Sequence, residues 1–370
     1  MVLSNDVLKQ DERAIFGLRS LYRAHGYSQF KMSKFEEYDL YVRNKSFLVS
    51  DHIITFTDTN GKLLALKPDV TLSIVKNSKD TPDCVQKVYY DENVYRVSGS
   101  HSSYREIMQA GLECIGAVDA YCIAEVLTLA IESLSQISPD FVLDVSHLGI
   151  LSAVLDAIPV SDAGRAQLLR CVGEKNLHGV DEICIGEGVD PSVASTLKAL
   201  ITGYGSVTTV LSKLEALLDG EAAKMLCELA SVLSAVPSDR LRIDFSVTGD
   251  LGYYNGIVFK GFINGIPQSI LSGGQYDNLL KKMGRKAGAI GFALYLDLLE
   301  ELSASPAEYD VDTVLLYDAS TPVGNVMQAV KELTAMGKTV SAQKTVPEKL
   351  RYRTLQKLTE KGVETLETNA

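Results

Sequence analysis

The spacing of apolar residues divides the first part of the chain into one helix followed by short strands. Residues 5–25 carry apolar positions three and four apart, with Asn5 or Asp6 at the helix start and Gly26 after its end. Pro68 suits the first turn of a second helix, which we expect over 68–78, and a third is predicted over 119–135. Between the helices the apolar runs are short, which is typical of strands; the best candidates are 53–57, 85–90, 93–97 and 112–115.

A change in pattern marks the middle of the chain. Residues from about 147 to 236 are rich in Ala, Leu and Ser at helical spacing and carry almost no strand signal, which indicates a helical insertion. Strand patterns then return, with Asn264-Gly265 as a hairpin turn and Gly273-Gly274 as a break before a helix. The predicted strands are 241–246, 253–262, 267–271 and a buried strand over 288–296 that runs into a helix near Glu301.

The last part of the chain, after Ser305-Pro306, has a different organisation. Its pattern predicts strands over 311–317 and 339–343 and helices over 323–336 and 347–361. Alternating strands and helices form mostly parallel sheets, so we expect a small α/β unit. The domain boundaries are therefore 1–305 for the larger part and 306–370 for the smaller one.

Composition excludes several classes of protein. With 370 residues, of which 46% are apolar and 22% charged, the chain has the profile of a globular protein of two or three domains. The net charge of -11 argues against broad contact with a phosphate backbone, so binding to tRNA is not expected. No apolar run has the length of a membrane span and no signal peptide is evident, which predicts a cytoplasmic protein that binds no membrane.

Motifs for metals and cofactors are absent from the sequence. The six cysteines show no C-x-x-C pair, and the five histidines show no H-x-x-x-H pair, so reduced thiols and no metal site are expected. Gly337-Lys338-Thr339 has the end of a phosphate-binding loop but Glu332 where that loop needs glycine. We therefore expect no cofactor.

Three widely separated segments carry the strongest signal in the chain. The first is LKPDVT at 66–71, and the second is NVYR at 93–96 followed by SYREIMQAGLE at 103–113. The third comprises GYYNGIVF at 252–259, GGQYD at 273–277 and GFA at 291–293. In this order they resemble the motifs of class II aminoacyl-tRNA synthetases of the histidyl type. The resemblance covers residues 5 to 300, and the tail resembles a shortened anticodon-binding domain.

The polar residues of these segments suit recognition of an amino acid. Gln109 and Glu113 share one face of a strand, and with Asp69 and Thr71 they offer an acidic pocket for an ammonium group and an imidazole N–H. Tyrosines supply flat walls and hydroxyls for an imidazole ring. The resemblance implies that the histidine-binding residues are Asp69, Thr71, Gln109, Glu113, Tyr253, Tyr254 and Tyr276. The competing interpretation is that these polar groups only satisfy strand edges and turns.

Two arginines remain from the nucleotide-binding part of the pattern. A guanidinium group suits phosphate oxygens, and in the synthetases the position of Arg96 faces a phosphate of ATP. Arg96 and Arg105 are therefore candidates for phosphate or nucleotide contact. An ion pair with a neighbouring acid is an equally good interpretation of either residue.

The departures from the synthetase pattern are as informative as the matches. An arginine important for amino-acid activation is replaced by Gly249, and the arginine that clamps ATP is replaced by Leu298. Losing one such charge contact typically costs about 3 kcal/mol of transition-state stabilisation, so adenylation by this chain is not expected and no residue is assigned as catalytic. Further replacements of synthetase motif residues are Lys34, Ser98, Ser103, Gln275 and Tyr295.

The pattern of matches and losses resembles one branch of the synthetase family, the regulatory subunits of ATP phosphoribosyltransferase. Residues 143–149 (LDVSHLG) are similar to that branch's D-x-x-H-x-G, in which we expect His147 only to make a local hydrogen bond at a helix start. The resemblance implies an α+β fold with an antiparallel sheet and flanking helices. It also implies a homodimer within a hetero-oligomer with the catalytic short-form subunit, and L-histidine as the effector.

Two other functions remain open on the sequence. One is a divergent histidyl-tRNA synthetase, which Gly249 and Leu298 argue against. The other is a different synthetase-like paralogue with a ligand other than histidine or a role in tRNA binding.

Overall fold

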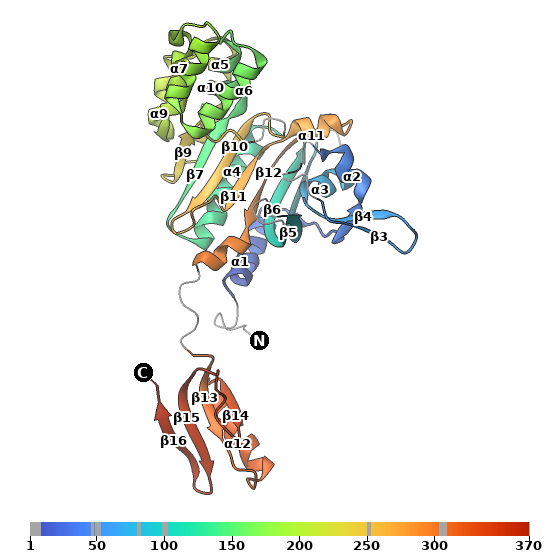
Figure 1. The fold of residues 1–370 in the computed structure, drawn as a ribbon, viewed down its shortest axis with the longest axis vertical. Coiled ribbons are helices and arrows are strands. Elements are labelled where there is room, and N and C mark those ends of the chain that lie inside the picture. Colours follow the sequence, from blue (N-terminus) through green and yellow to red (C-terminus); the bar gives the residue numbers. More distant parts are fainter. Residues whose placement is uncertain are drawn as a thin grey trace. The chain divides into compact units, whose positions relative to one another are not determined.

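The computed structural model describes residues 9–45, 48, 53–79, 83–97, 103–249, 253–302 and 309–369. The chain divides into two compact units, Met1–Leu302 and Ser303–Ala370 (Figure 1). Each unit has its own hydrophobic core, so each is described separately.

A large sheet forms the centre of the first unit. Within the described residues it has nine strands in the order β1-β5-β6-β12-β11-β10-β7-β9-β8, antiparallel except for the pairs β1–β5 and β7–β9. The predicted α+β fold with a mainly antiparallel sheet is therefore confirmed. The strands are β1 (Ser28–Gln29), β5 (Val85–Val97), β6 (Tyr104–Gly116), β7 (Phe141–His147), β8 (Tyr204–Ser206), β9 (Leu241–Asp244), β10 (Ile257–Ile263), β11 (Leu271–Gln275) and β12 (Gly288–Tyr295).

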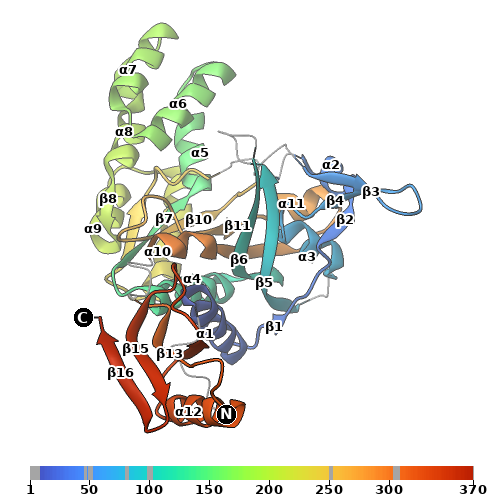
Figure 2. The same ribbon diagram turned by 60° about the horizontal axis from the view of Figure 1, so that its bottom comes forward.

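Helices α1 (Gln10–Ala24) and α4 (Ala120–Ile137) pack together on one face of this sheet (Figure 2). The Asp119 side chain caps α4 by accepting a hydrogen bond from the backbone N–H of Cys122. By length and composition α4 is apolar enough to cross a membrane, contrary to our expectation from the sequence. Its apolar residues instead belong to the core against the sheet, where Leu134 lies over Gly261 of β10.

The segment between β7 and β9 is helical apart from the short strand β8 (Figure 1). His147 begins it as the N-cap of α5, its Nδ1 accepting a hydrogen bond from the N–H of Ile150 at 3.2 Å, which confirms the predicted local role. The helices pack mainly as the pairs α5–α10 and α6–α7. They are α5 (Leu148–Asp156), α6 (Asp162–Glu174), α7 (Leu177–Gly186), η2 (Pro191–Ala194), α8 (Ser195–Thr202), α9 (Val207–Glu215) and α10 (Gly220–Ser234).

Smaller elements cover part of the opposite face of the large sheet. Among the described residues, β2 (Phe35–Glu37), β4 (Leu63–Leu66) and β3 (Thr55–Thr57) form a separate antiparallel sheet. Buried side chains of α3 and α11 join those of β5 and β6 in a second core. The remaining helices of this unit are α2 (Tyr38–Arg43), α3 (Thr71–Asn77), α11 (Asp277–Lys282) and η3 (Leu296–Leu302).

Two strand predictions in this unit were wrong in detail. The strands expected over 85–90 and 93–97 are one continuous strand, β5. The strand expected over 267–271 begins only at Leu271 and includes Gly273-Gly274, where the sequence predicts a break. The reason is tertiary, because a Cβ on Gly273 would lie 2.5 Å from the Cβ of Phe292 on β12. These glycines allow close strand contact.

The second unit also differs from its prediction. Residues 347–361 are not a helix, because residues 352–359 form a strand that pairs in parallel with β13. Leu355 and Leu358 are spaced as in a helix. The segment instead pairs with the edge of β13, and the turn before Gly362 joins β15 to β16 in a hairpin. The elements are β13 (Val311–Leu316), α12 (Val323–Ala335), β14 (Val340–Gln343), β15 (Tyr352–Thr359) and β16 (Gly362–Thr368).

The six cysteines all lie within the described residues and are free thiols. Four are buried, while Cys84 and Cys227 are exposed.

Candidate ligand-binding site

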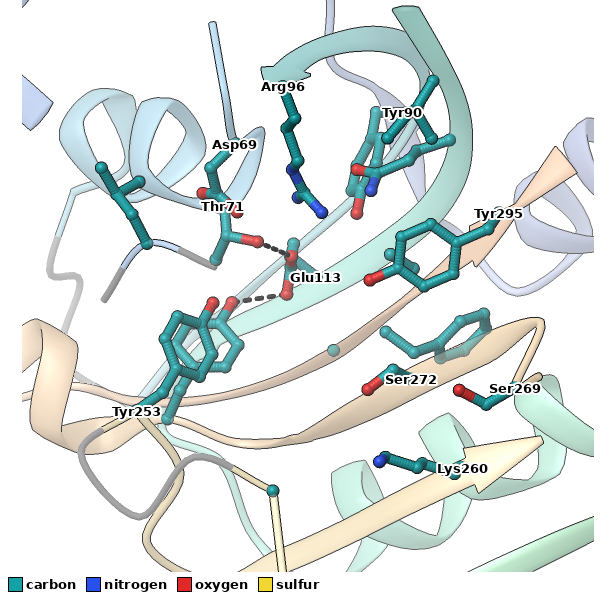
Figure 3. A pocket seen from close by; sticks show the side chains of 18 of the residues that line it. Asp69, Thr71, Tyr90, Arg96, Glu113, Tyr253, Lys260, Ser269, Ser272 and Tyr295 are labelled. Carbon is teal, nitrogen blue, oxygen red and sulfur yellow. Dashed lines mark hydrogen bonds between the residues drawn. The ribbon is translucent and has the colours of Figure 1, made fainter. Parts of the chain in front are cut away.

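A cavity of about 600 Å³ opens on the face of the large sheet that α1 and α4 leave uncovered (Figure 3). Its floor is made of small residues, since the strand register places Gly291 and Ala293 of β12 beside Gly274 and Ser272 of β11. Directly opposite residues on neighbouring strands share one face of a sheet. Bulky side chains at these positions would fill the space, so the cavity follows from the sequence of β11 and β12.

Glu113 lies at the centre of the cavity wall on β6 and is only 2% exposed. Its Oε1 accepts a hydrogen bond from the Thr71 hydroxyl at 2.7 Å, and its Oε2 accepts one from the Tyr276 hydroxyl at 2.5 Å (Figure 3). Thr71 opens α3 and Tyr276 precedes α11, so three elements hold this carboxyl group. Two fixed donors leave it little freedom to rotate.

Burial governs the acid–base behaviour of the two cavity carboxyls. It raises the pKa of Glu113 to about 8, against the opposing effect of its two hydroxyl donors and with a smaller contribution from the charge of Asp69. Burial also raises the pKa of Asp69, whose Oδ1 accepts the Leu72 N–H at 2.8 Å. Near neutral pH the Glu113 carboxyl is therefore largely protonated, and a cation arriving beside it would favour its ionised form.

Three tyrosines form an aromatic wall beside Glu113. The ring centroids of Tyr253 and Tyr254 are 4.6 Å apart, and those of Tyr253 and Tyr276 are 5.7 Å apart. These spacings lie in the range of tilted and edge-to-face aromatic pairs. The wall presents flat apolar surface next to a polar carboxyl, which suits a planar ring that bears a hydrogen-bond donor.

Gln109 lies two residues before Gly111 on the same strand face as Glu113 and is 3% exposed. Its Nε2 has no hydrogen-bond partner among the described residues. A buried donor without a partner costs about 1–3 kcal/mol, which a ligand acceptor would recover. The amide is therefore available to a bound molecule.

Arg96 and Arg105 lie directly opposite each other on β5 and β6 at the rim of the cavity. The Nε of Arg96 donates to the Pro68 carbonyl oxygen at 2.9 Å, and Arg105 is exposed. Neither guanidinium forms a salt bridge with a carboxylate of any described residue, but the charge of Arg96 acts on Asp69 and opposes the rise of its pKa. Like charges facing each other in this way favour an anion at the rim.

The model of the histidyl-tRNA synthetase family matches residues 3–299. The chain belongs to this family. It is 28% identical over 303 residues to an ATP phosphoribosyltransferase regulatory subunit of Oceanobacillus iheyensis, covering 80% of this chain and 74% of the relative. It is also 28% identical over 334 residues to a histidine–tRNA ligase of Methanococcus vannielii, covering 87% of this chain and 78% of the relative.

Solved structures of the same family share the fold. A protein from Bacillus halodurans, described as an ATP phosphoribosyltransferase regulatory subunit/histidyl-tRNA synthetase, matches with a TM-score of 0.75 and 23% identity over 96% of both chains. The ATP phosphoribosyl transferase complex from Thermotoga maritima contains a chain that matches with a TM-score of 0.61 and 20% identity, over 76% of this chain and 96% of that one. The resemblance seen in the sequence is thus confirmed for both branches of the family.

The residues that resembled the synthetase motifs come together in space. The candidate binding residues come from α3, β5 and β6 and from the loops beside α3, β10 and α11, and all of them line the cavity. The set is Asp69, Thr71, Arg96, Arg105, Gln109, Glu113, Tyr253, Tyr254 and Tyr276. That these residues bind histidine remains a prediction.

Some of the positions at which this chain departs from the synthetases line the same cavity. They include Gly249, Tyr295 and Leu298. Gly249 has a φ of +56°, a left-handed conformation that strains residues with a side chain, so the backbone as well as the side chain suits glycine here. The cavity therefore keeps its acidic and aromatic wall but lacks two arginines of the synthetase pattern.

Sequence reasoning missed several lining residues on the central strands. Lys260 of β10 and Ser272 of β11 are direct cross-strand neighbours, and Tyr90 lies on β5. Lys260 could have been noticed because it is the only charged residue in the apolar run 257–263. The other missed lining residues include Gln268, Ser269 and Asp297.

Gly291 is expected to be essential for this arrangement. A Cβ at this position would lie 1.8 Å from Oε2 of Glu113, so Gly291→Ala must displace the buried carboxyl from Thr71 or Tyr276. We expect the free energy of unfolding to fall by about 1–3 kcal/mol. Gly324→Ala in α12 is the matched control, because a Cβ added there would meet nothing within 4 Å. Urea denaturation of the two variants measures the difference; equal stability would contradict the close contact.

Proposed function

We propose that this chain is a non-catalytic regulatory subunit of ATP phosphoribosyltransferase that binds L-histidine in the cavity around Glu113. The relative from Oceanobacillus iheyensis carries the name of this subunit, and the Thermotoga maritima structure is titled as a complex of the enzyme, which supports the assignment. In this proposal the chain is cytoplasmic and forms a homodimer within a hetero-oligomer with the catalytic short-form subunit. Its Ser303–Ala370 unit is a truncated anticodon-binding domain.

The observation that carries the proposal is the uneven composition of the cavity. The acidic and aromatic residues that suit histidine are present, while Gly249 and Leu298 stand where synthetases have arginines for activation. Each missing arginine costs about 3 kcal/mol of transition-state stabilisation, so their combined loss removes most adenylation. Such a cavity fits binding of histidine without its activation.

The cavity chemistry gives each part of histidine a partner. The imidazole ring fits against Tyr253 and Tyr276 with an N–H directed to Glu113, whose carboxylate form the interaction would favour. The ammonium group fits beside Asp69, and the free amide of Gln109 is a donor for a ligand acceptor. Histidine and the substrates of the catalytic subunit would then be coupled reciprocally, each weakening binding of the other.

A divergent histidyl-tRNA synthetase is the second candidate. Arg96 and Arg105 still line the rim, and the Methanococcus vannielii ligase matches a larger share of this chain than the regulatory subunit does. If this candidate is correct, the chain must form histidyl-adenylate without the arginines at 249 and 298.

Two assays on the purified full chain separate these candidates. We expect no histidine-dependent pyrophosphate–ATP exchange, because the arginines that stabilise the transition state are absent. Added to the short-form catalytic subunit of the same organism, the chain should raise the phosphoribosyltransferase rate, and L-histidine should lower it. Exchange that depends on histidine would overturn the proposal, as would a catalytic subunit whose rate responds to neither the chain nor histidine.

A further inference from the structure

Lys260 is a cation at the side of the cavity opposite the acids, and the proposed function gives it no role. It lies in the centre of β10, where the neighbouring positions 259 and 261 are buried in the core against α4. Because side chains alternate along a strand, Lys260 projects from the other face, and it lines the cavity. Figure 3 shows it near Ser272, on the far side of the cavity from Asp69 and Glu113.

Within the part of the chain that the structure describes, no side chain pairs with the charge of Lys260. Lys260 makes no hydrogen bond or ion pair with any residue that the structure describes. Asp144 of β7 is its direct cross-strand neighbour, but the charges that act on Asp144 are those of Asp244, Lys175 and Arg242. A half-buried ammonium with no partner among the described residues, in a strand that is otherwise apolar, is available to an anion from outside the chain.

Lys260 and Glu113 line the cavity from strands on its two sides. Glu113 is on β6 and Lys260 on β10, separated by β12 and β11, so about 14 Å divides the two backbones. The floor between them consists of Gly291, Gly274 and Ser272 with Ala293, and a glutamate and a lysine reach inward from its two sides. Glu113 and Lys260 on opposite sides of the cavity thus suit the imidazole end and the carboxylate end of one histidine.

Gly249, which stands where synthetases have an arginine, lies close to the strand that carries Lys260. The Cβ position of Gly249 lies 3.7 Å from Cγ1 of Val258, which is two residues before Lys260 on the same strand face. Gly249 and Lys260 both line the cavity. The chain has a cation near this place on a different element.

We propose that the Lys260 ammonium binds the α-carboxylate of the amino-acid ligand, in place of the arginine that synthetases carry at position 249. This inference rests on the proposed function and adds to it a residue that selects for the free carboxylate. Lysine acts as a point charge, whereas arginine forms a directional fork. The ligand carboxylate would thus be held for binding but not oriented for attack on a phosphate.

The test compares L-histidine with histamine, which lacks the carboxylate, by isothermal titration of the full chain. In Lys260→Gln we expect the affinity for L-histidine to fall about 10- to 100-fold, the effect of losing one charge-assisted hydrogen bond. Binding of histamine should stay within about twofold, which also shows that the variant is folded. Lys260→Arg should restore most of the affinity, and Lys213→Gln in α9, which is exposed, is the control.

Each remaining outcome counts against the inference in a distinguishable way. If Lys260→Gln weakens the binding of histidine and histamine equally, or weakens neither, Lys260 does not bind the carboxylate. The same follows if the unmodified chain binds histidine and histamine equally. In these cases the proposed function stands. If Lys260→Gln abolishes binding of AMP but not of histidine, the anion is a phosphate and the carboxylate assignment is wrong. If the unmodified chain binds neither histidine nor histamine, the proposed function fails and the inference fails with it.

Discussion

Replacing Glu113 with alanine is expected to weaken binding of L-histidine by roughly 100-fold or more. The carboxyl is buried, held by Thr71 and Tyr276, and central to the cavity, so no neighbouring group can replace it. Truncating one partner of a buried hydrogen-bonded charge pair typically costs about 2–5 kcal/mol. The measurement is isothermal titration with L-histidine before and after the substitution.

Stability must be monitored alongside this experiment. Glu113→Ala leaves the Thr71 and Tyr276 hydroxyls without their acceptor, so part of any effect comes from the protein itself. Glu215→Ala, at the exposed end of α9, is the matched control and should bind as the unmodified chain does. A folded Glu113→Ala protein with unchanged affinity would place histidine elsewhere or exclude it as the ligand.

The second large effect concerns pH, again through Glu113. Its pKa is raised from 4.5 to about 8 in the folded chain, mainly by burial. Between these values the native state binds more protons than the unfolded state, so the free energy of unfolding falls as pH rises. From about pH 5 to about pH 9 the loss is on the order of 4 kcal/mol in the absence of ligand.

Glu113→Gln isolates this contribution, because glutamine keeps the shape of the side chain but cannot ionise. Other groups with a raised pKa, such as Asp144 at about 6, titrate in both proteins. Their contributions to the free energy of unfolding therefore largely cancel in the comparison. Denaturation at several pH values should show the two stabilities changing together below about pH 4.5, with the variant increasingly the more stable as the pH rises to about 8 and the difference constant above that. Parallel curves would show that Glu113 ionises in the native state at its ordinary pKa.

Much of the first unit was predictable because its signals are local and repeated. The helix that became α4, the helical segment after β7 and the strands around Glu113 each follow from periodicity over many residues. The spacing of Gln109 and Glu113 was enough to place both on one strand face, and both line the cavity. The same local reasoning failed for 347–361, where leucine spacing predicted a helix and pairing with β13 produced a strand.

The candidate site was only partly visible in the sequence. Its acids, arginines and tyrosines, with Thr71 and Gln109, stood out through their resemblance to known motifs, and all nine line one cavity. Lys260 did not stand out, because a lone lysine in an apolar run belongs to no known motif. Its place opposite Glu113 depends on the register of four strands.

The sequence by itself determined which side chains are present to bind a ligand and which arginines of the synthetase pattern are missing. It also determined which residues share a strand face, because side chains alternate along a strand. The tertiary structure alone decided the floor of small residues, the two hydroxyls on Glu113 and the raised pKa that follows from its burial. These depend on contacts between residues distant in the sequence, 42 positions apart for Thr71 and Glu113 and 163 for Glu113 and Tyr276. Burial and cross-strand register are properties of the assembled sheet, and no local pattern encodes them.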